Sequence, residues 1–293
     1  MSAEAITASV SQLAPVAKER DRFALLALPG LLYLGILFAL PLLILLVKSL
    51  INAEGDLSLA GYAAFFSDPF NLSVFWRTLR VALLTTLLSL VLAYPTAFAM
   101  VRAGGWILTL MLVAMVLPLS VGVIVKAFSW SIVLRSNGIV NQALMGLGLV
   151  DEPVRLLFTE TALVFGAANI FLPFMVLPIY AVVRQLDPNL SGAAATLGSG
   201  PLRTFLTVTL PLTLPGIIAG VAFVFSLAVS MYVIPSLIVG ERHQNLAMMI
   251  ARAFLFLRNE QLGSVIAVVL LAIATAVVFS SALLLRLVER RQR

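Results

Sequence analysis

Long uncharged stretches are the clearest feature of this sequence, and six of them have 21 residues or more. About 20 apolar residues in a helix are enough to cross a bilayer. A backbone that faces lipid must form all of its hydrogen bonds within a helix or a closed barrel. Apolar runs of this length without alternating polarity exclude barrel strands. The six stretches are residues 23–47, 81–101, 103–125, 161–183, 204–240 and 261–285. The pattern predicts an all-α membrane protein with six transmembrane helices.

A shorter uncharged stretch, residues 136–150, has a different character. Its 15 residues are too few for a span, and it contains Asn137, Asn141 and three glycines. We interpret it as a surface or re-entrant helix. The stretch 204–240 is longer than a span requires, so we expect it to include extra residues at both ends.

Composition supports the assignment as a membrane protein and excludes several other classes of protein and kinds of site. Of the 293 residues, 61% are hydrophobic and 11% charged, whereas soluble domains have roughly 25% charged residues. The 19 lysines and arginines are scattered between apolar runs, so a basic face for nucleic acid is not expected. The absence of cysteine removes disulfides, thiol nucleophiles and thiolate metal sites. The first apolar run has 25 residues, too many for a signal-peptide core, which predicts an uncleaved first helix.

The distribution of lysine and arginine predicts the orientation, because cytoplasmic loops are enriched in these residues. With six spans, both termini lie on one side. If that side is cytoplasmic, it holds ten cations and five acids, whereas the opposite side holds eight of each. Four arginines directly after the last stretch also favour a cytoplasmic C-terminus. We therefore predict a cytoplasmic N-terminal segment (1–22), a six-helix membrane domain (23–285) and a basic cytoplasmic tail (286–293).

The segment between the fourth and fifth stretches carries the strongest local signals. Asp187 is suited to the N-cap of a helix and Pro188 to its first position. Gly198 is suited to the left-handed residue that follows a last turn. These residues predict a cytoplasmic helix of about ten residues, 188–197.

One face of this predicted helix is apolar and narrow. Residues at steps of four, four and three form a single stripe, namely Leu186, Leu190, Ala194 and Leu197. Gly192 and Ala193 keep the helix thin, so another backbone can approach it closely. By local chemistry alone, the segment also fits a simple connector between two spans.

This segment resembles the EAA loop of ABC importer permeases. The family pattern is Glu-Ala-Ala, a glycine four residues after the second alanine, and a later apolar-x-Leu-Pro. The corresponding positions here are Gly192, Ala193, Ala194, Gly198, Val208, Leu210 and Pro211. The sequence departs from the pattern at Gly192, where the family usually has glutamate.

The resemblance covers residues 25–285 and reaches the spermidine/putrescine permease branch of that family. It is carried by five further motifs outside the loop. They are Ala93-Tyr94-Pro95, Arg135-Ser136-Asn137-Gly138, Asp151-Glu152-Pro153, Phe171-Leu172-Pro173-Phe174-Met175 and Leu214-Pro215-Gly216-Ile217. This branch also resembles permeases for other small solutes.

The resemblance implies a type I ABC importer permease in the bacterial inner membrane. Residues 187–198 then form a coupling helix in a cleft of a cytoplasmic ATPase. Its coupling residues are Asp187, Gly192, Ala193, Ala194, Leu197 and Gly198. The implied partners are two ABC ATPases, a second homologous permease in a heterodimer, a periplasmic solute-binding protein and membrane lipid. This sequence has no glycine-rich loop followed by Lys and Ser or Thr, the motif that binds nucleotide phosphates. ATP and magnesium are therefore expected to bind to the ATPases. We expect neither enzymatic activity nor a cofactor in this chain.

Polar and aromatic side chains in the spans are the candidates for a solute pathway, because intramembrane polar groups are costly unless they face a cavity or a neighbour. The candidates are Lys126, Ser129, Trp130, Asn169, Phe171 and Tyr232. Alternative roles are snorkelling to headgroups for Lys126 and helix packing for Asn169. For Trp130 and Tyr232 the alternative is an interfacial aromatic belt.

The choice of solute and of transport class leaves alternatives open. No Asp or Glu lies inside an apolar stretch. A polyamine would therefore have to bind through contacts between its ammonium groups and aromatic rings. An amino-acid-like or phosphonate solute remains an alternative. A channel or secondary transporter predicts intramembrane charges or inverted repeats, which are not clear here. A membrane-embedded enzyme needs a catalytic cluster at membrane depth, but the single histidine, His243, is expected in a solvated outer loop.

Overall fold

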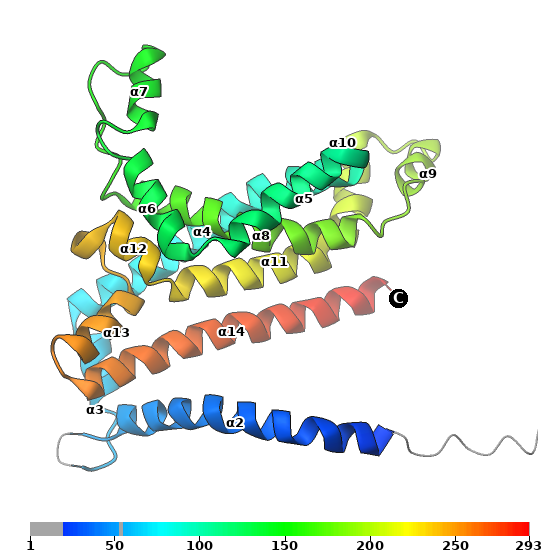
Figure 1. Ribbon diagram of the computed structural model, residues 1–293. Coiled ribbons are helices and arrows are strands. Elements are labelled where there is room, and N and C mark those ends of the chain that lie inside the picture. Colours follow the sequence, from blue (N-terminus) through cyan, green and yellow to red (C-terminus); the bar gives the residue numbers. More distant parts are fainter. Residues whose placement is uncertain (1–19, 53–54, 293) are drawn as a thin grey trace, which may run out of the picture. The chain divides into compact units, whose positions relative to one another are not determined.

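The computed structural model describes residues 20–52 and 55–292 and is built from helices (Figure 1), which confirms the all-α fold class. It divides into two compact units, Met1–Lys48 and Ser49–Arg293. Helix α2 (Arg20–Leu50) runs through the described part of the first unit. Most of the predicted N-terminal segment 1–22 lies outside the described residues.

Five helical segments of the described chain are long and apolar enough to cross a membrane, and a bent pair of helices makes a sixth. The first is the apolar part of α2, residues Leu28–Leu50. The others are α4 (Pro69–Arg102), α8 (Glu160–Val183), the continuous segment Pro201–Ser230 and α14 (Glu260–Gln292). Helix α14 continues to Gln292 and so includes most of the predicted tail 286–293.

The predicted third span, 103–125, is wrong as one continuous helix. Helix α5 (Gly105–Ser120) ends before Val121, and α6 (Val123–Val133) leaves at an angle of 104°. Val121 is extended at the break, and it is followed by Gly122, a residue type that is unfavourable inside helices. Both halves are apolar, so hydropathy does not reveal the bend.

The expectation that the stretch 204–240 extends beyond its span is confirmed at the C-terminal end, because the span is Pro201–Ser230, but it is wrong at the N-terminal end, where the span begins before residue 204. It begins with α10 (Pro201–Thr204) and a π-helical turn (Phe205–Thr209), and α11 (Leu210–Ser230) completes it. The chain is extended at Met231 and then forms the short helix α12 (Val233–Ile238). A proline ring in a helix clashes with the carbonyl four residues earlier; for Pro235 that residue is Met231, where α11 has stopped.

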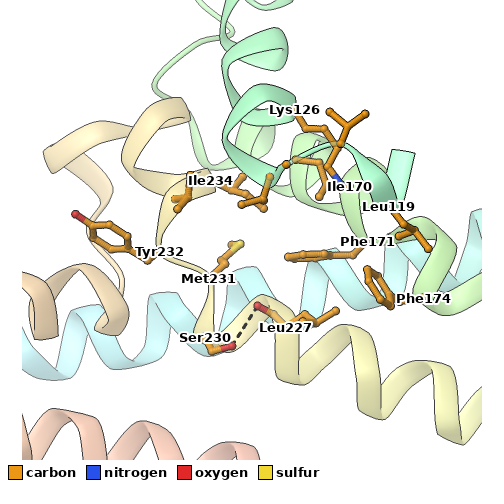
Figure 2. A pocket seen from close by; sticks show the side chains of 14 residues that line it. Leu119, Lys126, Ile170, Phe171, Phe174, Leu227, Ser230, Met231, Tyr232 and Ile234 are labelled. Carbon is orange, nitrogen blue, oxygen red and sulfur yellow. Dashed lines mark hydrogen bonds between the residues drawn. The ribbon is translucent and has the colours of Figure 1, made fainter. Parts of the chain in front are cut away.

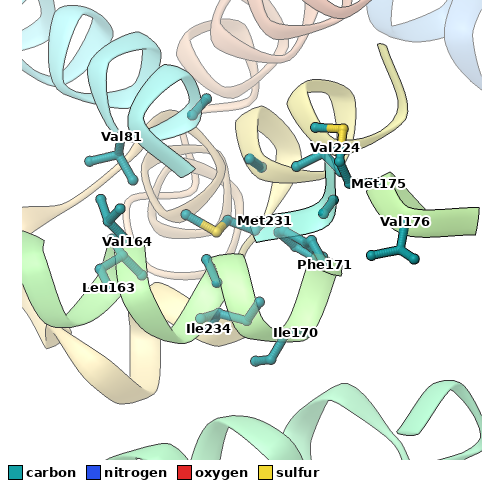
Figure 3. Packing of buried hydrophobic residues seen from close by; sticks show 14 of the residues in the cluster. Val81, Leu163, Val164, Ile170, Phe171, Met175, Val176, Val224, Met231 and Ile234 are labelled. Atoms are coloured by element: carbon teal, nitrogen blue, oxygen red, sulfur yellow. The ribbon is translucent and has the colours of Figure 1, made fainter. Parts of the chain in front are cut away.

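Helices α4, α8 and α11 pack together around the larger hydrophobic core (Figure 3). The close approach of α8 and α11 depends on glycine. A Cβ atom at Gly220 would lie 2.7 Å from the Met175 sulfur, and one at Gly216 would lie 2.9 Å from the Pro178 carbonyl oxygen. Small residues at such crossings allow membrane helices to pack backbone to backbone, so these helices form a rigid support for the site described below.

A second core cluster lies among α3 (Ala60–Ser67), α4, α13 (Leu246–Leu255) and α14. Phe65, Leu246 and Ile266 are fully buried in it. The Leu246 amide also donates to the Thr78 hydroxyl, at 3.0 Å, which fixes the start of α13 on α4.

The predicted short helix within residues 136–150 is confirmed as α7 (Ile139–Gly146), which projects from the helix bundle of the second unit (Figure 1). Buried Asn141 organises the surrounding loop. Its side-chain amide donates to the carbonyls of Arg135 and Val154, at 3.1 and 2.9 Å. Its oxygen accepts from the Val154 amide at 2.8 Å, so all three bonds hold one side of the loop to the other.

Candidate functional site

A cavity of about 420 Å³ lies where two interrupted helical segments approach α8 (Figure 2). The break between α5 and α6 forms one wall, and the end of α11 with the start of α12 forms another. The third wall is α8, through Ile170, Phe171 and Phe174. This volume falls within the range typical of small-molecule sites, about 300–1,000 Å³.

The cavity is lined by the C-terminal ends of two helices, α5 and α11. The last carbonyls of a helix have no partner within it and carry partial negative charge. Interrupted membrane helices commonly place such ends at solute and ion sites. The aromatic rings of Phe171, Phe174 and Tyr232 add apolar faces that can also contact a cation. The cavity can therefore accept a small, partly apolar solute with hydrogen-bond donors.

Three of the six predicted pathway residues line this cavity, namely Lys126, Phe171 and Tyr232. Lys126 lies on α6 beyond the helix break, not near the end of a continuous span as the sequence had indicated. Phe171 is buried, and Tyr232 is about half exposed at the break that follows α11. The position of both helix breaks explains why these residues meet.

The other three predicted residues do not line the cavity. The Trp130 indole N–H donates to the Asn169 side-chain oxygen at 3.3 Å, so this pair joins α6 to α8. This is the packing role considered for Asn169. The Ser129 hydroxyl donates to the Val125 carbonyl of its own helix at 2.9 Å.

The segment that resembles an EAA loop forms a short helix, α9 (Leu190–Thr196), at the end of the second unit opposite α7 (Figure 1). It is shorter than predicted, and Asn189 occupies the N-cap position instead of Asp187. Asp187 accepts from the Asn189 amide at 2.9 Å and so stabilises the preceding turn. Gly198 has a φ of +78° and ends the helix in the left-handed conformation, as predicted.

The surface of α9 is narrow and open. A Cβ atom at Gly192 would meet nothing within 4 Å. Ala193 is exposed and Ala194 is half-buried. Leu197, at the end of the predicted apolar stripe, is 88% exposed. A small apolar helix that projects from a membrane domain with its face uncovered is suited to insertion into another protein.

Residues 9–293 match the family model described as "Binding-protein-dependent transport system inner membrane component". The chain belongs to this family. The permease is also 32% identical over 246 residues to the spermidine/putrescine transport system permease protein PotB of Haemophilus influenzae, covering 82% of this chain and 86% of that one. The PotB protein of Escherichia coli is 34% identical over 203 residues, or 69% of this chain and 74% of that one.

The fold of the permease matches that of a solved importer. A chain of a bacterial ABC transporter involved in the import of the acidic polysaccharide alginate aligns with a TM-score of 0.69. The alignment covers 92% of this chain and 96% of that chain, at 17% sequence identity. The prediction of an ABC importer permease fold is confirmed by this match.

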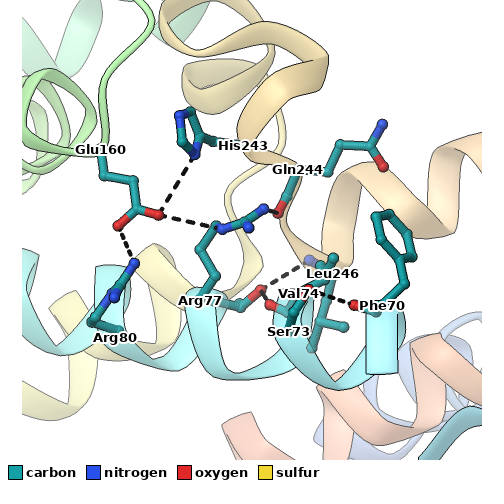
Figure 4. A network of polar contacts seen from close by, with 10 residues as sticks. Phe70, Ser73, Val74, Arg77, Arg80, Glu160, His243, Gln244 and Leu246 are labelled. Atoms are coloured by element: carbon teal, nitrogen blue, oxygen red, sulfur yellow. Dashed lines mark hydrogen bonds and ion pairs between the residues drawn. The ribbon is translucent and has the colours of Figure 1, made fainter. Parts of the chain in front are cut away.

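A charged cluster that the sequence did not reveal joins three segments of the permease (Figure 4). Glu160, in the first turn of α8, forms ion pairs with Arg77, at 3.3 Å, and with Arg80 of α4. His243 Nδ1 lies 3.6 Å from the same carboxylate, and its side chain is only 34% exposed. The expectation that His243 is simply solvated is therefore wrong.

The cluster could not be predicted from the sequence, because its members come from separate loops and helices. The one available signal was Glu160 itself, a carboxylate directly before an apolar stretch, where it also complements the helix dipole. Arg77 continues the network by donating to the Gln244 carbonyl at 3.4 Å. The cluster thus holds the segment before α13 against α4 and α8.

Replacing Glu160 with glutamine should lower the stability of the permease by about 1 kcal/mol, because two arginines lose their counter-charge at a partly exposed site. The measurement is the melting temperature of the purified protein. The loss should shrink at high salt, which screens the native ion pairs. Exposed Glu241, changed in the same way, is the control and should have no effect. Equal melting temperatures for the wild type and the Glu160 variant would contradict a stabilising role.

Proposed function

We propose that this permease is one of two membrane subunits of an ATP-driven importer that carries polyamines, such as spermidine or putrescine, into the cytoplasm. The observation that carries the proposal is the 32% identity to a spermidine/putrescine permease over 82% of the chain. A second, similar permease, two cytoplasmic ATPases and a periplasmic binding protein complete the transporter. ATP and magnesium are bound by the ATPases.

In this proposal, α9 is the contact through which an ATPase moves the permease. Its narrow, uncovered face supports that role, since Gly192 leaves open space where a side chain would stand. The Asp187 turn before the helix and the Gly198 turn after it hold the helix at both ends. Closure of the two ATPases would pull on α9 and, through α8 and α11, change access to the cavity.

The proposed orientation places both termini and α9 in the cytoplasm. The excess of lysine and arginine on that side of the predicted topology supports it. Helix α7 and the Glu160 cluster then lie at the periplasmic end, where the binding protein delivers the solute.

The cavity is proposed as part of the solute route. Its aromatic residues suit the methylene chain and the ammonium groups of a polyamine. One observation favours a second candidate, an amino-acid-like or phosphonate solute with an anionic group. The described residues that line the cavity include Lys126 but no carboxylate.

Uptake of radiolabelled spermidine and putrescine tests the proposal directly. Cells that express the complete gene cluster should accumulate the label, and cells that lack only this subunit should not. Unlabelled amino acids and phosphonates serve as competitors. Uptake that does not depend on the subunit would refute the proposal, and subunit-dependent entry of a competitor alone would replace polyamine by the second candidate.

A further inference from the structure

The charge of the cavity is unusual for a route that carries cations. Fourteen described residues line it, and Lys126 is the only one of them with a formal charge. The described part of the chain places no carboxylate in ion-pair distance of the Lys126 ammonium. The Ser230 hydroxyl, also in the lining, already donates to the Ser226 carbonyl at 2.7 Å. An uncompensated positive charge therefore faces the space that the solute would enter.

The other walls of the cavity attract cations. Phe171 and Phe174 on α8 supply aromatic rings, and Tyr232 also lies in the lining. The C-terminal ends of α5 and α11, which carry partial negative charge, border the cavity. Without Lys126, these groups would form a site in which a polycation could rest. Two like charges a few ångströms apart repel each other even at the intermediate dielectric of a protein surface, so one ammonium group can offset much of that attraction.

Building on the function proposed above, we propose that Lys126 sets the cation affinity of the cavity and keeps it a weak site for polycations. The binding protein outside the membrane then captures the solute, and the cavity releases it quickly. A cavity that bound its solute tightly would retain it at each turnover and slow transport. Lys126 is thus a specificity-determining residue that acts by repulsion instead of by contact.

Lys126→Met tests this inference in the complete transporter, purified in lipid nanodiscs. Binding of radiolabelled spermidine is measured without binding protein or ATP, and uptake is measured in proteoliposomes. The variant should bind spermidine about tenfold more tightly than the wild type, with a smaller gain for the less charged putrescine. Its maximal uptake rate should fall. Lys126→Arg should behave as the wild type, because it keeps the charge.

Controls separate this inference from the proposed function. Exposed Arg155 lies outside the cavity lining, and Arg155→Gln should leave spermidine binding unchanged. If the wild type itself shows no polyamine uptake, the proposed function fails. If the wild type transports polyamine but Lys126→Met binds it no more tightly, or if Lys126→Arg matches the methionine variant, the inference about charge is overturned. Weaker binding in Lys126→Met would also overturn it, because Lys126 would then be an attractive contact.

Discussion

Replacing Gly192 with tryptophan is expected to reduce uptake at least about tenfold while the permease remains folded in the membrane. Gly192 lies on the exposed face of α9, and a side chain added there meets no atom of this chain within 4 Å. The substitution should therefore leave the permease intact and block only the approach of another protein. A bulky side chain forced into a closely packed contact costs roughly 1–3 kcal/mol, and each 1.4 kcal/mol weakens binding about tenfold.

Three measurements define this result: uptake of radiolabelled spermidine, ATP hydrolysis, and the amount of permease in the membrane. Uptake should fall, ATP hydrolysis should no longer respond to the binding protein, and the amount of permease should not change. The matched control is Gly35→Trp in α2, another glycine at which an added Cβ atom would meet nothing within 4 Å, and this variant should keep normal uptake. Normal uptake in the Gly192 variant would exclude α9 as the coupling contact.

Replacing Gly216 with leucine is expected to destabilise the permease by roughly 3 kcal/mol or more, which makes it the most damaging single change to folding considered for this chain. A Cβ atom at this position would lie 2.9 Å from the Pro178 carbonyl oxygen and 3.0 Å from the Ile179 Cα. Both are backbone atoms of α8, so a rotamer change cannot relieve the clash. Helices α8 and α11 must separate, and the core between them must open.

The expected readout is a large loss of membrane-inserted permease and a lower melting temperature of what remains. Gly146→Leu provides the control, because the same side chain enters open space there. If the Gly216 variant were as stable as the control, α8 and α11 would not be packed as closely as described.

Hydropathy was sufficient to predict the fold class of this permease and the positions of several of its spans. The stretches 81–101 and 161–183 lie inside α4 and α8, and 261–285 lies inside α14. A membrane requires a minimum apolar length for each span, so this information is local and can be read from consecutive residues.

The breaks that create the cavity could not be predicted in the same way. The stretches 103–125 and 204–240, which contain Val121 and Met231, are uncharged and mostly apolar, so hydropathy continues across each break. What interrupts the helices is backbone chemistry. Gly122 is unfavourable inside a helix, and the ring of Pro235 destabilises a helix that would continue through Met231. Prolines elsewhere, such as Pro95 in α4, remain inside a helix, so proline alone does not identify a break.

Contacts between side chains that are far apart in the sequence could not be predicted either. Glu160 pairs with Arg77 and Arg80 from an earlier helix, and its contact with His243 depends on how the segment before α13 folds back. Lys126 and Tyr232 reach one cavity only because both helices are interrupted. Such meetings depend on the tertiary path of the chain, which a pattern of polar and apolar residues does not contain.

Coupling of solute movement to a partner ATPase is tested most directly in proteoliposomes that contain this permease, the second permease and the ATPases, with the binding protein added outside. Radiolabelled spermidine uptake and ATP hydrolysis are measured in the same vesicles, with and without this subunit. The expected result is uptake that requires ATP, the binding protein and this permease together. Uptake at the full rate without ATP would contradict it and would indicate a channel or a secondary transporter.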